Sequence, residues 1–306
     1  VYQQLGELYI KQERTKDAAD AFGAFAKRQP LHAQAPQLQA RVIDIYQNAG
    51  FATLAIDAKK DYVSRYGMEG EFRKANPEGW EAAQPLVKTH MAELARHHHA
   101  LAQKSKASAD YQEAVRWYRA YLGAFPNDPD TAQNNFLLAE LLREDSRFPE
   151  AAVEYEKTAY QYPTHERSAD AGYSALLSYA AQEKRMQGAE LQALQRTGVD
   201  SALRFAKAFP ADAREEDAMI ALFDRVEAEL ADRGAVRVHR RDELQLHARD
   251  ILEHGDDFVE RHVAVVVHVS RRCVLRLLRR DGLRRARHVG ARAERDHQVL
   301  VRDRAR

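Results

Sequence analysis

Small, apolar and aromatic side chains recur at fixed intervals along the first two thirds of this chain. The opening segment carries them at seven positions: Tyr2, Leu5, Gly6, Tyr9, Ala18, Phe22 and Pro30. This spacing predicts two helices joined by a turn. Proline cannot continue a helix, so Pro30 is expected to end the second one.

The arrangement recurs in two later segments. The first ends at Pro126 and the second at Pro163, and they hold, in order, Leu101, Ala102, Ala114 and Tyr118, then Leu138, Ala139, Ala151 and Tyr155. The two prolines are 37 residues apart, as are Pro30 and Gly67, which closes a more degenerate copy. The longer intervals before Pro126 and Pro210 predict insertions near residues 68–90 and 187–200. We therefore expect about five repeats within residues 1–210.

Each recurring position has a physical reason. Small residues such as Gly6 and Ala114 let the paired helices approach closely. Aromatic residues such as Phe22 and Tyr155 fill the gap to the next helix pair. One helical hairpin cannot bury its apolar face, whereas five stacked hairpins can. The alternative is an ordinary helical bundle in which the spacing is accidental.

These residues match the pattern of the tetratricopeptide repeat, which is aromatic-x2-Leu-Gly-x2-Tyr, then Ala-x3-Phe, then Pro. Tyr2 replaces the usual Trp. The resemblance covers residues 1–210. It implies an all-α fold, a right-handed α-solenoid of stacked helix–turn–helix units. It also implies a non-catalytic scaffold that binds other proteins.

The repeats that end in FP or YP, followed by a polar link and an alanine-rich helix, resemble those of Gram-negative envelope proteins. These include the BamD-like outer-membrane-assembly lipoproteins and the periplasmic partners of the Tol–Pal system. The resemblance implies a location in the periplasm or at the outer membrane, with the cytoplasm as the alternative.

By the same resemblance, the first helix of each unit lines a concave groove that binds a protein or peptide. The outward positions of these helices are Gln3, Glu7, Asp44, Gln47, Arg96, His99, Gln103, Lys106, Gln133, Phe136, Glu140 and Arg143. Gln3 and Glu7 occupy the positions where chaperone-binding members carry a Lys and an Asn, which argues against binding of a chaperone tail. Mixed charges with one aromatic residue, Phe136, suit an extended or helical peptide.

Histidines form the most conspicuous cluster, at His90 and at His97, His98 and His99. Consecutive histidines point about 100° apart on a helix, so few of them could share one metal ion. The repeat register predicts that His98 is packed, that His99 faces the groove and that His97 points away. We therefore expect three separate roles and no metal site.

Motifs for catalysis are missing from the chain. There is no GxSxG, no glycine-rich phosphate loop and no Cys–His pairing in residues 1–235. Trp80 and Trp117 are expected to pack in the interior. We expect no enzyme active site, no small-molecule substrate and no cofactor. In the alternative hypothesis, the helices form an accessory domain of a larger enzyme or secretion complex.

The net charge of +1 conceals a difference between the two ends of the chain. Residues 236–306 hold 18 Arg and no Lys against 11 acidic residues, which leaves 29 basic against 35 acidic residues elsewhere. The mildly acidic solenoid argues against nonspecific nucleic-acid binding by that part.

The tail, residues 211–306, loses the repeat pattern. It is rich in Arg, Ala, Val, His and Asp, which GC-rich coding sequence yields when it is translated out of frame. We hypothesise that the tail is a frameshift product or disordered from about residue 236. The alternatives are a genuine unrecognised domain and a basic arm that binds nucleic acid or acidic lipid.

The chain begins at Val1, inside an expected helix, without an initiator Met or a signal sequence. We therefore expect a fragment whose targeting signal is missing. No stretch approaches the roughly 18 apolar residues of a membrane span. Any attachment to a membrane is expected to depend on a missing N-terminal anchor.

Overall fold

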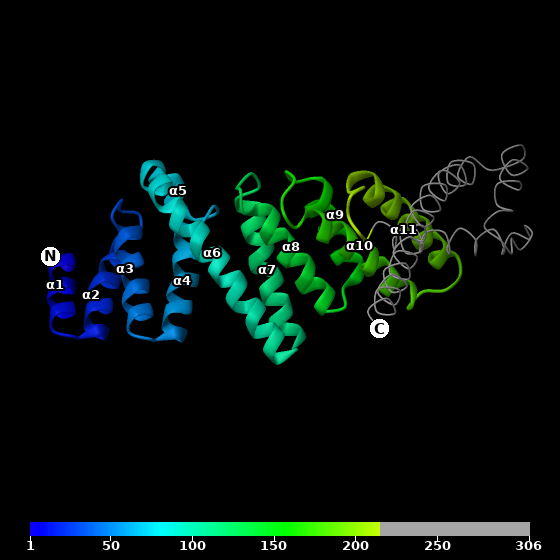
Figure 1. The fold of residues 1–306 in the computed structure, drawn as a ribbon. Coiled ribbons are helices and arrows are strands. Elements are labelled where there is room, and N and C mark those ends of the chain that lie inside the picture. The colour runs from blue at the N-terminus through cyan, green and yellow to red at the C-terminus, as the bar shows by residue number, and fades with distance from the viewer. Residues whose placement is uncertain (215–306) are drawn as a thin grey trace, which may run out of the picture. The chain divides into compact units, whose positions relative to one another are not determined.

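The structure, a computed structural model, describes residues 1–214. Every regular element in this range is an α-helix (Figure 1). In chain order the helices are α1 (Tyr2–Lys11), α2 (Thr15–Arg28), α3 (Ala35–Asn48), α4 (Ala52–Tyr66), α5 (Glu71–Ala75), α6 (Pro77–Ser105), α7 (Ser108–Ala124), α8 (Thr131–Glu144), α9 (Phe148–Tyr160), α10 (Ser168–Glu183) and α11 (Gly188–Ala208). The prediction of an all-α fold is confirmed for residues 1–214.

The chain divides into two compact units. The first, Val1–Met186, contains α1 to α10, and the second begins at Gln187 and contains α11. Within the first unit, each helix packs against the next helix along the chain. The first unit is therefore built from consecutive helical neighbours.

Side-chain contacts also join the first helices of successive pairs. Arg41 of α3 donates to Glu7 of α1 at 3.1 Å, and Gln103 of α6 donates to Glu144 of α8 at 2.8 Å. We call α1, α3, α6 and α8 the first-helix row. These contacts hold neighbouring members of the row side by side.

The second helices of the pairs are joined in the same way. Lys60 of α4 lies 4.0 Å from Glu113 of α7, and Arg119 of α7 lies 2.7 Å from Glu150 of α9. We call α2, α4, α7 and α9 the second-helix row. Helices two places apart in the chain, or three where α5 intervenes, are thus neighbours within the two rows.

The small and aromatic positions of the repeat pattern are buried together. Gly6 of α1 lies against Phe22 of α2, so closely that a Cβ atom on Gly6 would be 2.4 Å from the ring. Tyr118 and Tyr155 are also completely buried. The alanines that precede these two tyrosines in α7 and α9 have no exposed surface either, namely Ala114 and Ala151.

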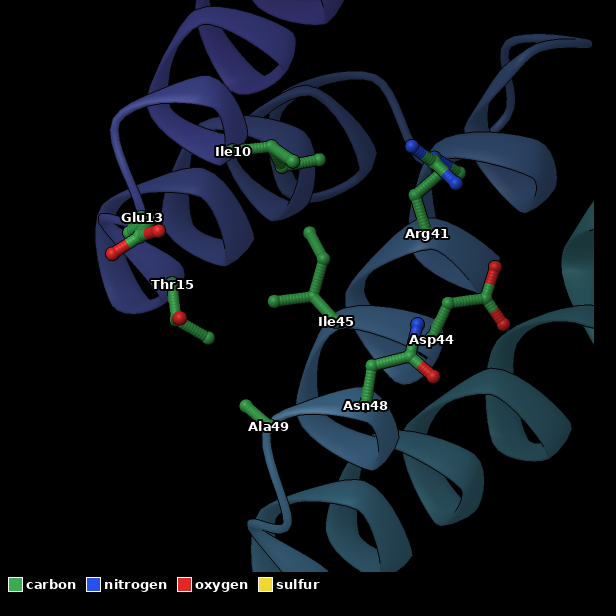
Figure 2. A pocket seen from close by; sticks show the side chains of 8 residues that line it. All are labelled: Ile10, Glu13, Thr15, Arg41, Asp44, Ile45, Asn48 and Ala49. Carbon is green, nitrogen blue, oxygen red and sulfur yellow. The ribbon is translucent and has the colours of Figure 1, made fainter.

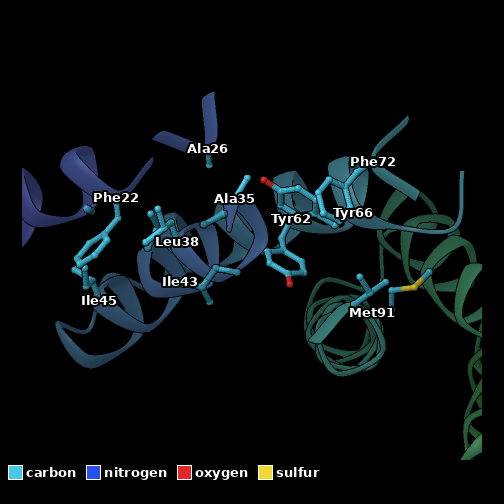
Figure 3. Close-up of a cluster of buried hydrophobic side chains, with 14 of the residues drawn as sticks. Phe22, Ala26, Ala35, Leu38, Ile43, Ile45, Tyr62, Tyr66, Phe72 and Met91 are labelled. Atoms are coloured by element: carbon cyan, nitrogen blue, oxygen red, sulfur yellow. The ribbon is translucent and has the colours of Figure 1, made fainter. Parts of the chain in front are cut away.

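Residues 68–90, expected as an insertion, form α5 and the first half of α6. Their side chains join a hydrophobic cluster that extends from α2 to α7 (Figure 3). Tyr66 packs edge-on against Phe72 of α5, with 5.1 Å between ring centroids. The indole N–H of Trp80 donates to the Tyr66 carbonyl at 3.1 Å. The segment therefore belongs to the core, and the prediction that Trp80 packs in the interior is confirmed.

Residues 187–200, also expected as an insertion, belong to α11, which buries Leu194, Val199 and Phe205.

The expected tail lies outside the described residues from residue 215 onward. Among residues 1–214, no helix combines the length and the apolar character that crossing a bilayer requires.

We expect Gly6→Ala to lower the free energy of unfolding by about 1–3 kcal/mol, because the new Cβ atom would overlap the Phe22 ring. Gly23→Ala is the matched control. Its Cβ would meet Val42 at an ordinary 3.6 Å, and alanine favours a helix interior by about 0.5–1 kcal/mol. Urea denaturation followed by circular dichroism measures both changes. Equal effects of the two substitutions would contradict the close contact at Gly6.

Candidate functional site

The first-helix row carries most of the predicted groove residues on accessible surface. Seven of them are exposed: Gln3, Asp44, Gln47, Arg96, Gln103, Lys106 and Gln133. Three more are partly buried: Glu7, Glu140 and Arg143. These ten side chains can contact a ligand without unfolding of the helices.

The other two predicted groove residues are buried, so the expectation that they are open to a partner is wrong. Phe136 is 3% exposed; its ring packs edge-on against Tyr155, and the Arg167 guanidinium lies 4.3 Å from its centroid. His99 is 8% exposed, and its Nδ1 lies 3.0 Å from the Tyr118 hydroxyl. Both positions are covered because neighbouring helices of the unit pack closely there.

Polar contacts hold two predicted groove residues of α8, Glu140 and Arg143, against α9. The Tyr155 hydroxyl donates to Glu140, and Arg143 lies 3.1 Å from that hydroxyl and 3.2 Å from the Glu140 carboxylate. Burial, reinforced by the hydrogen bond to Glu140, raises the pKa of Tyr155. Glu140 and Arg143 thus serve the packing of α8 on α9.

Three other charged residues of the first-helix row take no part in polar contacts between helices. Asp44, Arg96 and Lys106 form no hydrogen bond or ion pair through their side chains with any residue in the described part of the chain. Lys106 ends α6 in the left-handed conformation, with φ 55°. These three charges are therefore available to a ligand.

A cavity of about 350 Å³ lies at the N-terminal end of the row (Figure 2). Its lining comes from the end of α1, the following turn, the start of α2, one face of α3 and the residue that follows α3: Ile10, Glu13, Thr15, Arg41, Asp44, Ile45, Asn48 and Ala49. In Figure 2, Ile10 points toward Ile45 of α3, whereas Glu13 and Asp44 lie on opposite sides of the gap.

Only Asp44 of this lining was among the predicted groove residues. Arg41 and Asn48 could have been added from the sequence, because they lie three and four residues from Asp44 on the same helix. Glu13 and Thr15 could not, because the path of the turn after α1 is not encoded in the repeat pattern.

A buried ion pair lies where α4 meets α6. The Lys59 residue is 5% exposed, and its Nζ lies 2.9 Å from the Glu93 carboxylate. His90 Nδ1 lies 3.2 Å from the same oxygen. Burial lowers the pKa of His90, and the hydrogen bond to Glu93 opposes that effect. The pKa of Glu93 is lowered, because the hydrogen bonds from Lys59 and His90 outweigh its burial.

His98 is packed and His97 is exposed, as the register predicted. The His98 ring is nearly parallel to that of Trp117, which is itself buried, with 7° between the ring planes. Neither ring nitrogen of His98 has a hydrogen-bond partner in residues 1–214.

Hydrogen bonds from Arg116 lower the pKa of the neighbouring Glu113 to about 2. The histidines of α6 thus have separate surroundings, and residues 1–214 contain no cluster of three or more His, Cys, Asp or Glu that could hold a metal ion.

No model of a known protein family matches the chain, and no curated protein is similar to it. A function for the chain is therefore inferred from the geometry of the first-helix row.

We expect Glu93→Gln to lower the free energy of unfolding by about 2–3 kcal/mol, because the buried Lys59 ammonium loses its counter-charge. Lys59→Met removes the buried cation, so it should cost less. Glu81→Gln, at an exposed position of α6, is the control and should have no measurable effect. Urea denaturation measures all three, and a larger loss for Lys59→Met than for Glu93→Gln would contradict this account.

Burial lowers the pKa of His90, His98 and His99. At mildly acidic pH the unfolded chain, in which histidine has an ordinary pKa of about 6.5, binds protons that the folded chain excludes. Stability is therefore full above about pH 6.5 and falls as the pH decreases. The slope is up to about 1.4 kcal/mol per pH unit for each proton taken up on unfolding. Urea denaturation between about pH 5 and 7.5 tests this, above the range in which ordinary carboxylates titrate.

His98→Phe should flatten this pH dependence, because phenylalanine keeps the packing against Trp117 and cannot take up a proton. His97→Gln, at an exposed position, should keep the slope of the wild type. An unchanged slope in His98→Phe would show that His98 does not contribute.

Proposed function

We propose that residues 1–210 are a right-handed α-solenoid of the tetratricopeptide type that acts as a non-catalytic scaffold. Its first-helix row binds a segment of a partner protein. The observation that carries the proposal is the cavity of about 350 Å³ on this row. Asp44 in its lining, and Arg96 and Lys106 further along the row, are exposed and have no side-chain partner within residues 1–214. The cavity offers a peptide a shaped site, and the charges along the row offer it polar contacts.

The framework around the proposed groove supports this function. Contacts of Glu7 with Arg41, and of Gln103 with Glu144, link successive row helices, and the buried core of the pairs holds those helices in place. A site on rigid helices loses little conformational entropy when it binds, which favours affinity. The unpaired Asp44, Arg96 and Lys106 side chains are distributed along the same row, and opposite charges on a partner would set its register.

The envelope location is part of the proposal. Its support is the resemblance of the repeat endings at Phe125–Pro126 and Tyr162–Pro163 to those of envelope scaffolds. The proposal makes the periplasm or the outer-membrane surface the place where the partner is met. A role as a helical accessory domain would use the same row, with a catalytic partner on another segment or chain. The nucleic-acid alternative depends on residues beyond those described.

Charge reversal on the row tests the proposal. We expect Arg96→Glu with Lys106→Glu to weaken capture of partner proteins from Gram-negative envelope extracts about tenfold, with melting temperature and helicity unchanged, because neither side chain forms an ion pair in the described part. Capture by the immobilised full chain is measured by quantitative mass spectrometry. Cytosolic extracts, processed in parallel, test the location.

Lys16→Glu with Lys27→Glu is the matched control, since both lysines are exposed on α2 in the second-helix row. It should leave capture unchanged. If both double variants lose the same proteins, or if neither loses any, the first-helix row is not the binding surface.

A further inference from the structure

The cavity at the N-terminal end of the first-helix row has an uneven charge balance. Three of its lining residues are charged: Glu13, Arg41 and Asp44. The Arg41 guanidinium is already engaged, because it donates to Glu7 at 3.1 Å and lies 5.7 Å from the centroid of the Phe22 ring. Within residues 1–214, the carboxylates of Glu13 and Asp44 have no ion-pair or hydrogen-bond partner. The cavity therefore has uncompensated negative charge.

The remaining lining is apolar with two neutral polar groups. Ile10 and Ile45 face each other across the cavity, and Ile10 is 37% exposed. Thr15 and Asn48 provide a hydroxyl and an amide, each with an oxygen that can accept a hydrogen bond. The site thus combines apolar walls with acceptors and offers no free cation.

This combination suits one kind of protein side chain. Lysine and arginine carry a charged, donor-only head on a long apolar stem, which they bury along apolar surface. The stem can cover the isoleucines while the head lies between the two carboxylates, which stand on opposite sides of the cavity (Figure 2). A purely apolar side chain would exclude water from two carboxylates without replacing its hydrogen bonds, which is unfavourable. An acidic side chain would be repelled.

We propose that this cavity takes a lysine or arginine side chain of the partner segment, with Glu13 and Asp44 as counter-charges and Ile10 and Ile45 along the stem. The inference rests on the proposed function of the first-helix row and specifies the partner chemistry at one position. The volume of about 350 Å³ is near the lower end of small-ligand sites, roughly 300–1,000 Å³, and leaves ample room for one long side chain.

Selection from a library of random twelve-residue peptides displayed on phage tests the proposal with the full chain as the target. Parallel selections use Glu13→Gln with Asp44→Asn, and a control in which Asp57→Asn and Glu81→Gln remove two exposed carboxylates elsewhere. We expect peptides selected on the wild type and on the control to share a Lys or Arg at one aligned position. Peptides selected on the Glu13/Asp44 variant should lack it.

One selected peptide and its Arg→Gln or Lys→Gln derivative then complete a double-mutant cycle, read by fluorescence polarisation. The derivative should bind the wild type about fivefold more weakly. It should bind the Glu13/Asp44 variant as well as the parent peptide does.

Peptides that bind without a shared basic residue, or a basic preference that survives in the Glu13/Asp44 variant, would overturn the inference and leave the proposed function standing. If no peptide is enriched on the wild type, both the inference and the proposed function fail.

Discussion

The close approach of paired helices at small residues is the constraint on which the rest of the first unit depends. At Gly6 there is no room for even one methyl group, because Phe22 fills the space that a Cβ atom would need. Ala102 and Ala139 lie at the equivalent positions of later pairs and are fully buried. This steric match sets the separation of the two helices in each pair. The separation in turn determines which side chains of the first-helix row remain exposed.

Much of the fold could be predicted because its repeat pattern is steric and local. The spacing from Gly6 to Phe22 predicted a helical pair, and recurrence predicted further pairs. The segment at residues 68–90 was recognised only as an excess of length. Its role depends on contacts such as Trp80 with the Tyr66 carbonyl, which join distant parts of the sequence and have no fixed spacing. Such contacts can be assigned only once the helices are placed.

The candidate site was less predictable. Register gives the direction of a side chain on its own helix, and it correctly separated His97 from His98. It does not show how near the next helix comes, so Phe136 and His99 were expected on the surface and are buried. Asp44 was the only lining residue of the cavity that the sequence predicted as part of a site, and three of the eight lining residues belong to α1, α2 and the turn between them. A binding site that spans several helices depends on tertiary distances that no local pattern encodes.

The long helix α6 has a mechanical consequence. Its 29 residues span about 43 Å without a break, and it packs against α3, α4, α5 and α7. A long helix that contacts several others resists bending of the first unit. Its weakest point is Pro85, where the proline nitrogen cannot donate and the Thr89 hydroxyl bonds the Pro85 carbonyl. Tension applied by a partner along the first-helix row would therefore flex the backbone first at this proline, upstream of the buried histidines.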